Sequence, residues 1–313
     1  MNIEYFEPLS RAWSRMKIAL FKPFDITKWF VIGFSAFLAG LTEGNGSSGG
    51  NGTSRVGDDW SFREFIEFPN RAWDWLMDNP GWFIAIVSFV VVLIAVGVTF
   101  TWLSSRGMFM FLDNVAQDKA EIAKPWKQYK SEGNSLFLWR LCFGLICFTL
   151  FIMFFIFFFT TGAFIYRESL YRHVPVPFLV GMGFLFFFMI IIIGYISMFL
   201  KSFVVPIMYK NNIKTTQAWS RFLSLFGQHP FHFILFGIFV FLLTIMFVLL
   251  IIVAGLLTCC IGIILLIIPY IGTVVSLPVW YTLRAFSLEY LAQFGPEYDV
   301  FPPTEAPAES AAA

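Results

Sequence analysis

The side chains that most often carry chemistry are few in this chain and widely spaced. Two of the three histidines, His229 and His232, form a pair three residues apart, but no third His, Cys or carboxylate lies near them in the sequence. A zinc site needs three or four converging ligands. No glycine-rich segment ends in the Lys and Ser or Thr that would hold a phosphate. We therefore predict no catalytic residue, no metal and no cofactor.

Carboxylates are missing from the middle of the apolar segments, where proton relays and ion-coupled carriers place them. The 62 residues from Phe222 to Leu283 contain no Lys, Arg, Asp or Glu. Polar groups in these segments are mostly Ser, Thr and Tyr, which usually hydrogen-bond one helix to another. Arg140 and Lys201 stand at segment ends, where a long basic side chain reaches back to the membrane surface. We expect a protein that is not an enzyme.

The composition is typical of a protein that meets lipid. The chain is 58% hydrophobic with 42 Phe residues and only 13% charged residues, whereas soluble proteins contain about 25%. A net charge of +1 indicates no surface for nucleic acid. The predicted fold class is an all-α integral membrane protein with the lipid bilayer as its main partner.

Six apolar segments are candidates for membrane spans, because a bilayer core of about 30 Å needs about 20 apolar residues. The first of them is short and would need flanking residues to complete the crossing. The predicted spans cover residues 24–42, 82–103, 141–165, 177–200, 231–254 and 262–284.

The distribution of basic residues supports six crossings. With six spans, sixteen of the 21 Lys and Arg residues fall on one side of the membrane. Without the first span this bias disappears. Basic residues concentrate in cytoplasmic segments, so both termini are predicted to be cytoplasmic.

The segments outside the spans differ in character. Residues 43–59 are rich in Gly and Ser and predict a flexible linker on the outer side. Residues 60–79 have an amphipathic pattern that predicts helix on the outer membrane surface. The tail, 301–313, is rich in Pro, Ala and Glu and predicts disorder. We expect one membrane domain over residues 1–300.

A short repeat precedes the odd-numbered spans. Ala-Trp-Ser-Arg occurs at residues 12–15 and again at 218–221, and Pro125-Trp126 begins a degraded third copy. Apolar residues at helical spacing accompany the first two copies, which predicts short cytoplasmic helices lying in the membrane interface ahead of spans 1, 3 and 5. The predicted interface anchors are Trp13, Arg15, Trp126, Trp219 and Arg221. A chance match of four residues is the alternative to a threefold repeat.

Three prolines, Pro206, Pro269 and Pro278, lie within or near spans. They predict helix kinks, either as ordinary packing features or as hinges beside a binding site.

Several segments carry a family resemblance. They are Phe203-Val204-Val205-Pro206-Ile207-Met208-Tyr209, Cys259-Cys260-Ile261-Gly262, Ile268 to Thr273, Leu277-Pro278, Arg284 and Gln293 to Tyr298. Together they resemble an uncharacterised bacterial six-span family, distantly similar to the membrane-anchor domain of some glycerophosphodiester phosphodiesterases. The resemblance implies a six-helix bundle in a bacterial cytoplasmic membrane. The phosphodiesterase domain is missing here, so its activity is not implied.

These observations favour a non-enzymatic anchor, scaffold or assembly factor with a protein partner at the cytoplasmic face. The alternative is a transporter of a neutral small molecule or lipid. A polar cavity in the membrane near the three prolines, faced by Tyr195 or Tyr270, would support the transporter.

Overall fold

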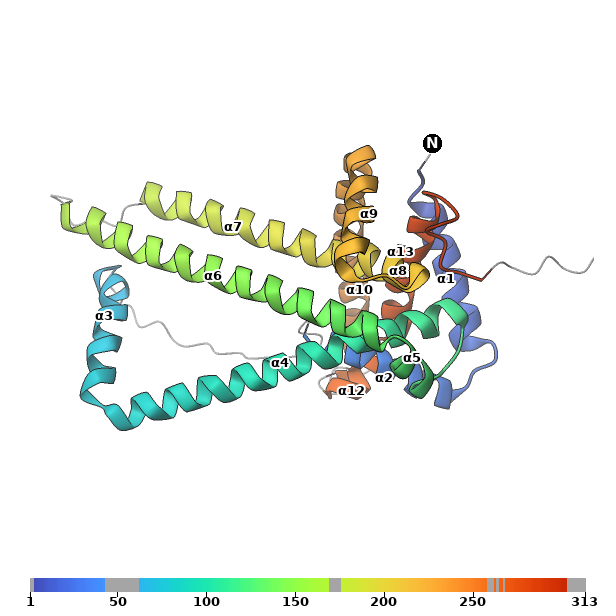
Figure 1. The fold of residues 1–313 in the computed structure, drawn as a ribbon, viewed down its shortest axis with the longest axis horizontal. Coiled ribbons are helices and arrows are strands. Elements are labelled where there is room, and N and C mark those ends of the chain that lie inside the picture. The colour runs from blue at the N-terminus through green and yellow to red at the C-terminus, as the bar shows by residue number, and fades with distance from the viewer. Residues whose placement is uncertain are drawn as a thin grey trace, which may run out of the picture. The chain divides into compact units, whose positions relative to one another are not determined.

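The computed structural model describes residues 3–42, 62–168, 176–257, 262, 265–266 and 268–302, and within these ranges the chain forms helices and no strands. Figure 1 shows the helices in chain order. They are α1 (Phe6–Phe21), α2 (Ile26–Gly40), α3 (Phe62–Asp78), α4 (Pro80–Gln117), α5 (Ala123–Gln128), α6 (Lys130–Glu168), α7 (Val176–Phe199), the π-helix η1 (Leu200–Val204), α8 (Val205–Asn211), α9 (Thr215–Gln228), α10 (Pro230–Leu257), α12 (Pro269–Val275) and α13 (Leu277–Ala292).

Four helical stretches in the described part of the chain are long and apolar enough to cross a membrane, which indicates a membrane protein. They are Pro80–Gln117, Lys130–Tyr166, Val176–Asn211 and Pro230–Leu257. The first predicted span corresponds to α2, whose 15 residues extend about 22 Å at 1.5 Å per residue. That is shorter than the bilayer core of about 30 Å. The structure thus supports four of the six predicted spans by length and composition.

The last predicted span is divided rather than continuous. α12 ends at Val275 and α13 begins at Leu277, with Ser276 between them. Pro278 is at the start of α13 and has no N–H to bond the carbonyl of Val274 four residues earlier. In its described part from Pro269 onward, the last predicted span is therefore two helices rather than one.

The chain separates into two compact units. Unit 1 contains residues 1–48, 100–139 and 197–313, and unit 2 contains residues 49–99 and 140–196. The divisions fall within α4, α6 and α7.

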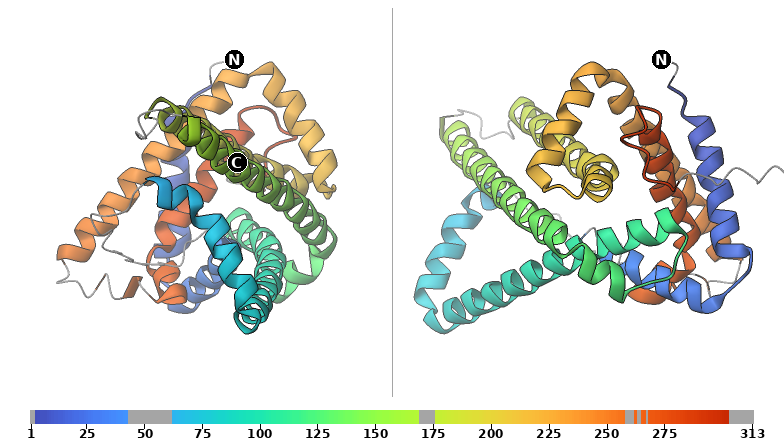
Figure 2. Two further views of the ribbon diagram at one scale, coloured as in Figure 1. Left: turned by 90° about the vertical axis from the view of Figure 1, so that its left-hand side faces the viewer. Right: turned by 45° about the vertical axis from the view of Figure 1, so that its right-hand side comes forward.

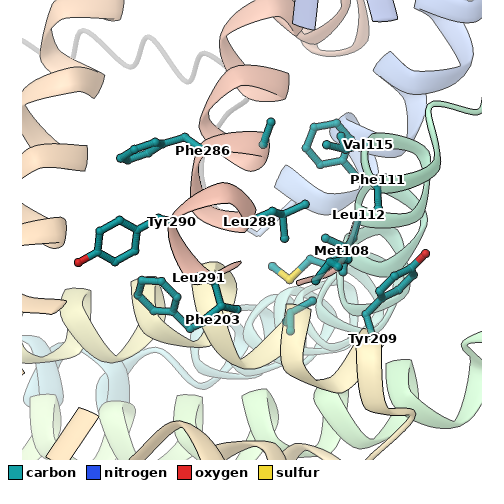
Figure 3. Close-up of a cluster of buried hydrophobic side chains, with 14 of the residues drawn as sticks. Met108, Phe111, Leu112, Val115, Phe203, Tyr209, Phe286, Leu288, Tyr290 and Leu291 are labelled. Carbon is teal, nitrogen blue, oxygen red and sulfur yellow. The ribbon is translucent and has the colours of Figure 1, made fainter. Parts of the chain in front are cut away.

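The core of unit 1 is built around α13, most of whose residues are buried. Figure 3 shows Phe286 and Tyr290 projecting to one side of this helix, while Leu288 points toward Met108 of α4. Phe286 stacks on Phe236 of α10 with ring centroids 5.3 Å apart. The α13 helix thus contacts its neighbours on several sides, which explains why it lacks an exposed face.

α1 lies along α13, as Figure 2 also shows. Its apolar stripe, which predicts a helix in the membrane interface, is buried inside unit 1. Ala12, Met16 and Leu20 are all 2% exposed or less. This part of the stripe therefore has a protein partner, whereas Trp13 is 42% exposed.

The two other predicted interface helices also have protein partners. In α9, Ala218 and Phe222 are fully buried, and Phe222 stacks on Phe203 of η1 at 5.4 Å. The third is α5, which has only six residues. Its Trp126 lies edge-on to Trp102 of α4, with centroids 5.9 Å apart.

Unit 2 contains α3 and the apolar parts of α4, α6 and α7. The amphipathic segment predicted over 60–79 is a single helix, α3, that continues through Pro69. Phe65 of α3 contacts Phe159 of α6, and Phe154 of α6 contacts Phe186 of α7 at 5.2 Å. The predicted linker, 43–59, lies outside the described residues.

Candidate functional site

A cavity of about 310 Å³ lies within unit 1, among α2, α4, the end of α7, η1, α10 and α13. This volume is at the lower end of the range of about 300–1,000 Å³ for small-molecule sites. Its wall is mostly apolar. The lining residues are Ala36, Ala39, Gly40, Met108, Phe111, Ser197, Met198, Lys201, Ser202, Phe236, Val240, Thr244, Trp280, Leu283, Arg284 and Ser287.

Small residues on α2 leave the space open. Ala36, Ala39 and Gly40 all face the cavity, so α2 contributes little side-chain volume there. α4 approaches α2 closely at Gly107, where an added Cβ would lie 2.7 Å from the backbone nitrogen of Ala39. The close approach holds α2 against α4 beside the cavity, and only glycine fits at that point.

Two basic side chains, Lys201 and Arg284, belong to the lining, and none of the described lining residues is acidic. Arg284 is buried in the middle of α13 and Lys201 is half-buried in η1. The Arg284 guanidinium donates through Nη1 to the carbonyl oxygen of Lys201 at 2.5 Å. The charged side chains in the described lining are therefore both basic.

Pro206 explains why the Lys201 carbonyl is free for this bond. In η1 the N–H of Val205 donates to Leu200, five residues earlier. The corresponding donor for Lys201 would be residue 206, which is proline and has no N–H. Arg284 donates in its place. Single π turns often occur at functional sites, and this one carries Lys201 and Ser202, both of which face the cavity.

Hydroxyl groups add hydrogen-bonding capacity to the basic side of the cavity. Ser197, Ser202 and Ser287 all belong to the lining. The Ser287 hydroxyl donates to the Arg284 carbonyl at 2.8 Å, so its oxygen can still accept a bond. Trp280 forms part of the apolar wall, and its indole N–H donates to Ser276 at 2.9 Å. The site thus combines a polar end with a larger apolar end.

A separate buried ion pair links α1 to α13. Glu289 is 5% exposed and accepts from Nε of Arg15 at 2.5 Å. Arg11 lies farther away, at 3.9 Å. The Arg15 guanidinium also stacks on the ring of Phe301, 3.7 Å from its centroid. Phe301 is buried although it belongs to the tail that is predicted to be disordered, and residues 303–313 of that tail lie outside the described residues.

A polar cluster surrounds Asp113, which is 5% exposed in α4. Its carboxylate accepts from the Tyr209 hydroxyl at 2.7 Å and from the Gln117 amide at 3.1 Å. The Tyr129 ring packs against Tyr209 with centroids 4.9 Å apart. Burial raises the pKa of the Tyr129 phenol, which therefore stays neutral at physiological pH. These bonds satisfy the buried carboxylate and connect α4 to α8.

The predicted interface anchors have varied surroundings. Trp13 is 42% exposed and Arg221 is exposed, whereas Trp126 and Trp219 are half-buried. Trp219 stacks on Trp139 at 5.2 Å. Arg15, expected to face water or anionic lipid, pairs with Glu289, and its side chain is 42% exposed.

None of the three predicted kink prolines lines the cavity, and Pro206 is in α8, directly after η1. Pro269 and Pro278 begin α12 and α13. Tyr270 does not face the cavity, because its hydroxyl donates to the Phe30 carbonyl at 2.9 Å. Tyr195 is likewise absent from the lining. The residues that line the cavity are therefore not those that the sequence predicts.

Sequence reasoning missed Lys201 and Arg284 as site residues. The sequence indicates for Lys201 only a reach back to the membrane surface, and the structure adds that this residue belongs to the cavity lining. One signal was present, since Arg284 ends the longest uncharged stretch of the chain. An ionisable residue at such a point is a functional candidate by default. In the described residues, no three His, Cys, Asp or Glu side chains gather as a metal site would require.

Comparison with known proteins assigns the chain to a family but not to a function. No curated protein and no solved structure matches it. The model of a family of unknown function, DUF7544, matches residues 4–287. This match covers all of unit 2 and most of unit 1, including the residues that line the cavity. The chain therefore belongs to the family of unknown function DUF7544.

Proposed function

We propose that this membrane protein binds a lipid-like amphiphile in the cavity of unit 1. The observation that carries the proposal is the composition of the lining, which joins an apolar wall to a polar end formed by Lys201, Arg284 and three serines. An amphiphile has the same two parts. Ligand sites usually combine mostly apolar walls with a few well-placed polar groups.

The proposal includes the membrane topology that the sequence predicts. The protein would cross a bacterial cytoplasmic membrane six times, with α2 and the divided α12–α13 segment as first and last spans and both termini in the cytoplasm. It would bind its ligand without chemical conversion. The distant resemblance to phosphodiesterase anchor domains is in keeping with a non-enzymatic role.

An anchor or scaffold with a protein partner at the cytoplasmic face is the competing proposal. It assigns no role to the cavity, so a side chain that fills the cavity should leave its function unchanged. If the protein binds lipid in the cavity, a side chain that fills the cavity should impair its function. The two proposals therefore differ in one measurable quantity, the amount of lipid held by the purified protein.

The test is Ala36→Leu. Ala36 is 7% exposed and faces the cavity, and leucine would occupy part of its volume. Ala95, exposed on the apolar part of α4, provides the matched control Ala95→Leu. After purification in detergent, native mass spectrometry would measure the fraction of protein carrying one lipid. We expect Ala36→Leu to lose most of this lipid and Ala95→Leu to retain it.

Thermal melting accompanies the binding measurement, because an overpacked core typically loses about 1–3 kcal/mol. A folded Ala36→Leu protein with unchanged lipid content would contradict the proposal. If the leucine variant does not fold, the smaller Ala36→Val replaces it. Equal loss of lipid from both leucine variants would indicate lipid bound on the outer surface and would also contradict the proposal.

A further inference from the structure

We infer that the ligand of this cavity carries an anionic phosphate or carboxylate group, and that Lys201 and Arg284 bind that group. The inference rests on the proposed function, because it names the chemical class of the amphiphile. It reverses the sequence-based expectation of a neutral substrate, which assumed spans without charges.

Charge composition is the first argument. The described lining contains two cationic side chains and no carboxylate. A cationic headgroup would meet repulsion from both, whereas an anionic headgroup would be attracted to both. Attraction between charges is stronger in a poorly solvated site than in water, and charge-assisted hydrogen bonds are about twice as strong as neutral ones.

The backbone around Lys201 provides the second argument. Arg284 donates one N–H to the Lys201 carbonyl, which holds the guanidinium against η1. Pro206 has no N–H to occupy the Lys201 carbonyl, and the Arg284 bond to that carbonyl brings the two basic residues together. An oxyanion with several acceptor oxygens suits this arrangement.

The hydroxyl groups extend the same pattern. Ser197 and Ser202 face the cavity together with Lys201, and serine hydroxyls donate to phosphate and carboxylate oxygens. The rest of the lining is apolar, including Phe236, Val240 and Leu283. A free inorganic anion would leave this apolar wall unused. We therefore assign the anion to a lipid headgroup, with the hydrocarbon against the wall.

The experiment compares ligands that differ in the headgroup. Delipidated protein in detergent would be titrated with dioleoyl phosphatidylglycerol, dioleoyl phosphatidylcholine and dioleoylglycerol, with binding measured by native mass spectrometry. Glycerol phosphate and inorganic phosphate test the headgroup without hydrocarbon. We expect phosphatidylglycerol to bind about tenfold more tightly than either of the other lipids, and the two soluble phosphates to bind far more weakly.

Substitutions then assign the preference to Lys201. Lys201→Gln should reduce the preference for phosphatidylglycerol to about twofold or less, while Lys201→Arg should keep it. Lys17→Gln is the control, because Lys17 is exposed on α1 and does not line the cavity. The lipid series needs no variant, so it decides the headgroup charge even if Lys201→Gln does not fold.

The outcomes separate this inference from the proposed function. If wild-type protein binds the three lipids equally and Ala36→Leu abolishes all binding, the cavity holds an amphiphile but the anionic assignment is wrong. Tight binding of inorganic phosphate alone would also overturn it, since the ligand would then be a soluble anion. If Ala36→Leu changes nothing, the proposed function itself fails.

Discussion

Glu289 is a buried carboxylate whose nearest charged partner comes from a helix at the other end of the chain. Arg15 reaches it from α1 at 2.5 Å, and the Arg15 side chain is itself 42% exposed. Removing one partner of a buried pair leaves an uncompensated charge, which costs more than the pair contributes when intact. The pair therefore secures the docking of α1 on α13.

Arg15→Gln should lower the melting temperature of the detergent-purified protein by several degrees. Partial exposure of Arg15 limits the loss to about 1–2 kcal/mol, below the usual cost for a fully buried pair. The double variant, Arg15→Gln with Glu289→Gln, should recover part of this loss of stability, since position 289 then carries no buried charge. Thermal melting of the two single variants and the double variant gives the coupling between the two residues.

The control is Glu7→Gln, which breaks the exposed pair between Glu7 and Arg11 in the first turns of α1. Exposed pairs contribute little, so no measurable change is expected. Equal melting temperatures for wild type and Arg15→Gln would show that the Arg15 pair has no structural role.

At the scale of secondary-structure elements, the π turn connects the conformation of the backbone with the arrangement of basic residues at the cavity. Regular α-helix through this region would require an N–H at residue 206, and proline has none. The helix accommodates the defect as a single π turn at Leu200–Val204. The same defect frees the Lys201 carbonyl for Arg284. One proline therefore determines how two basic residues are arranged at the cavity.

Pro206→Ala should weaken lipid binding, because alanine supplies an N–H that competes with Arg284 for the backbone carbonyls of η1. We expect affinity for phosphatidylglycerol to fall by about threefold to tenfold, measured in the titration described above. Pro269→Ala is the control. Pro269 is the first residue of α12, where its missing N–H costs no helical bond, and it does not line the cavity. Unchanged binding in Pro206→Ala would contradict a role for the π turn.

At the scale of the whole molecule, the repeat seen in the sequence corresponds to a recurring packing relation. Each short helix contacts the second helix of the hairpin that comes before it in the chain. α1 has no hairpin before it and packs on the second helix of the last one. α9 packs on η1 and α8, α5 contacts α4, and α1 packs on α13. The matched alanines, Ala12 and Ala218, are both fully buried. The Ala-Trp-Ser-Arg motif thus marks a helix-packing position in both copies.

The predicted topology can be checked by thiol labelling. In a cysteine-free background, Trp126→Cys should react with a membrane-impermeant thiol reagent only after the cells are opened, because the positive-inside rule places this segment in the cytoplasm. A cysteine at residue 47, in the predicted outer linker, should react in intact cells. Labelling of residue 126 in intact cells would overturn the six-span arrangement.

The sequence alone determined the class of the protein, because lipid contact requires long uncharged segments and few other environments tolerate them. It located the four long apolar helices and the short helices α1 and α9, whose patterns depend only on local spacing. It also placed a helix over most of residues 60–79. These features follow from composition and periodicity within one segment.

Only the tertiary structure decided which partners those helices have. An amphipathic stripe has the same pattern whether it meets a membrane surface or another helix, so the stripe of α1 did not reveal its packing on α13. Likewise, Lys201 and Arg284 are 83 residues apart, and neither has a local pattern that indicates a shared cavity. Their proximity depends on how η1 and α13 pack, because contacts between distant segments are determined by the fold rather than by spacing along the chain.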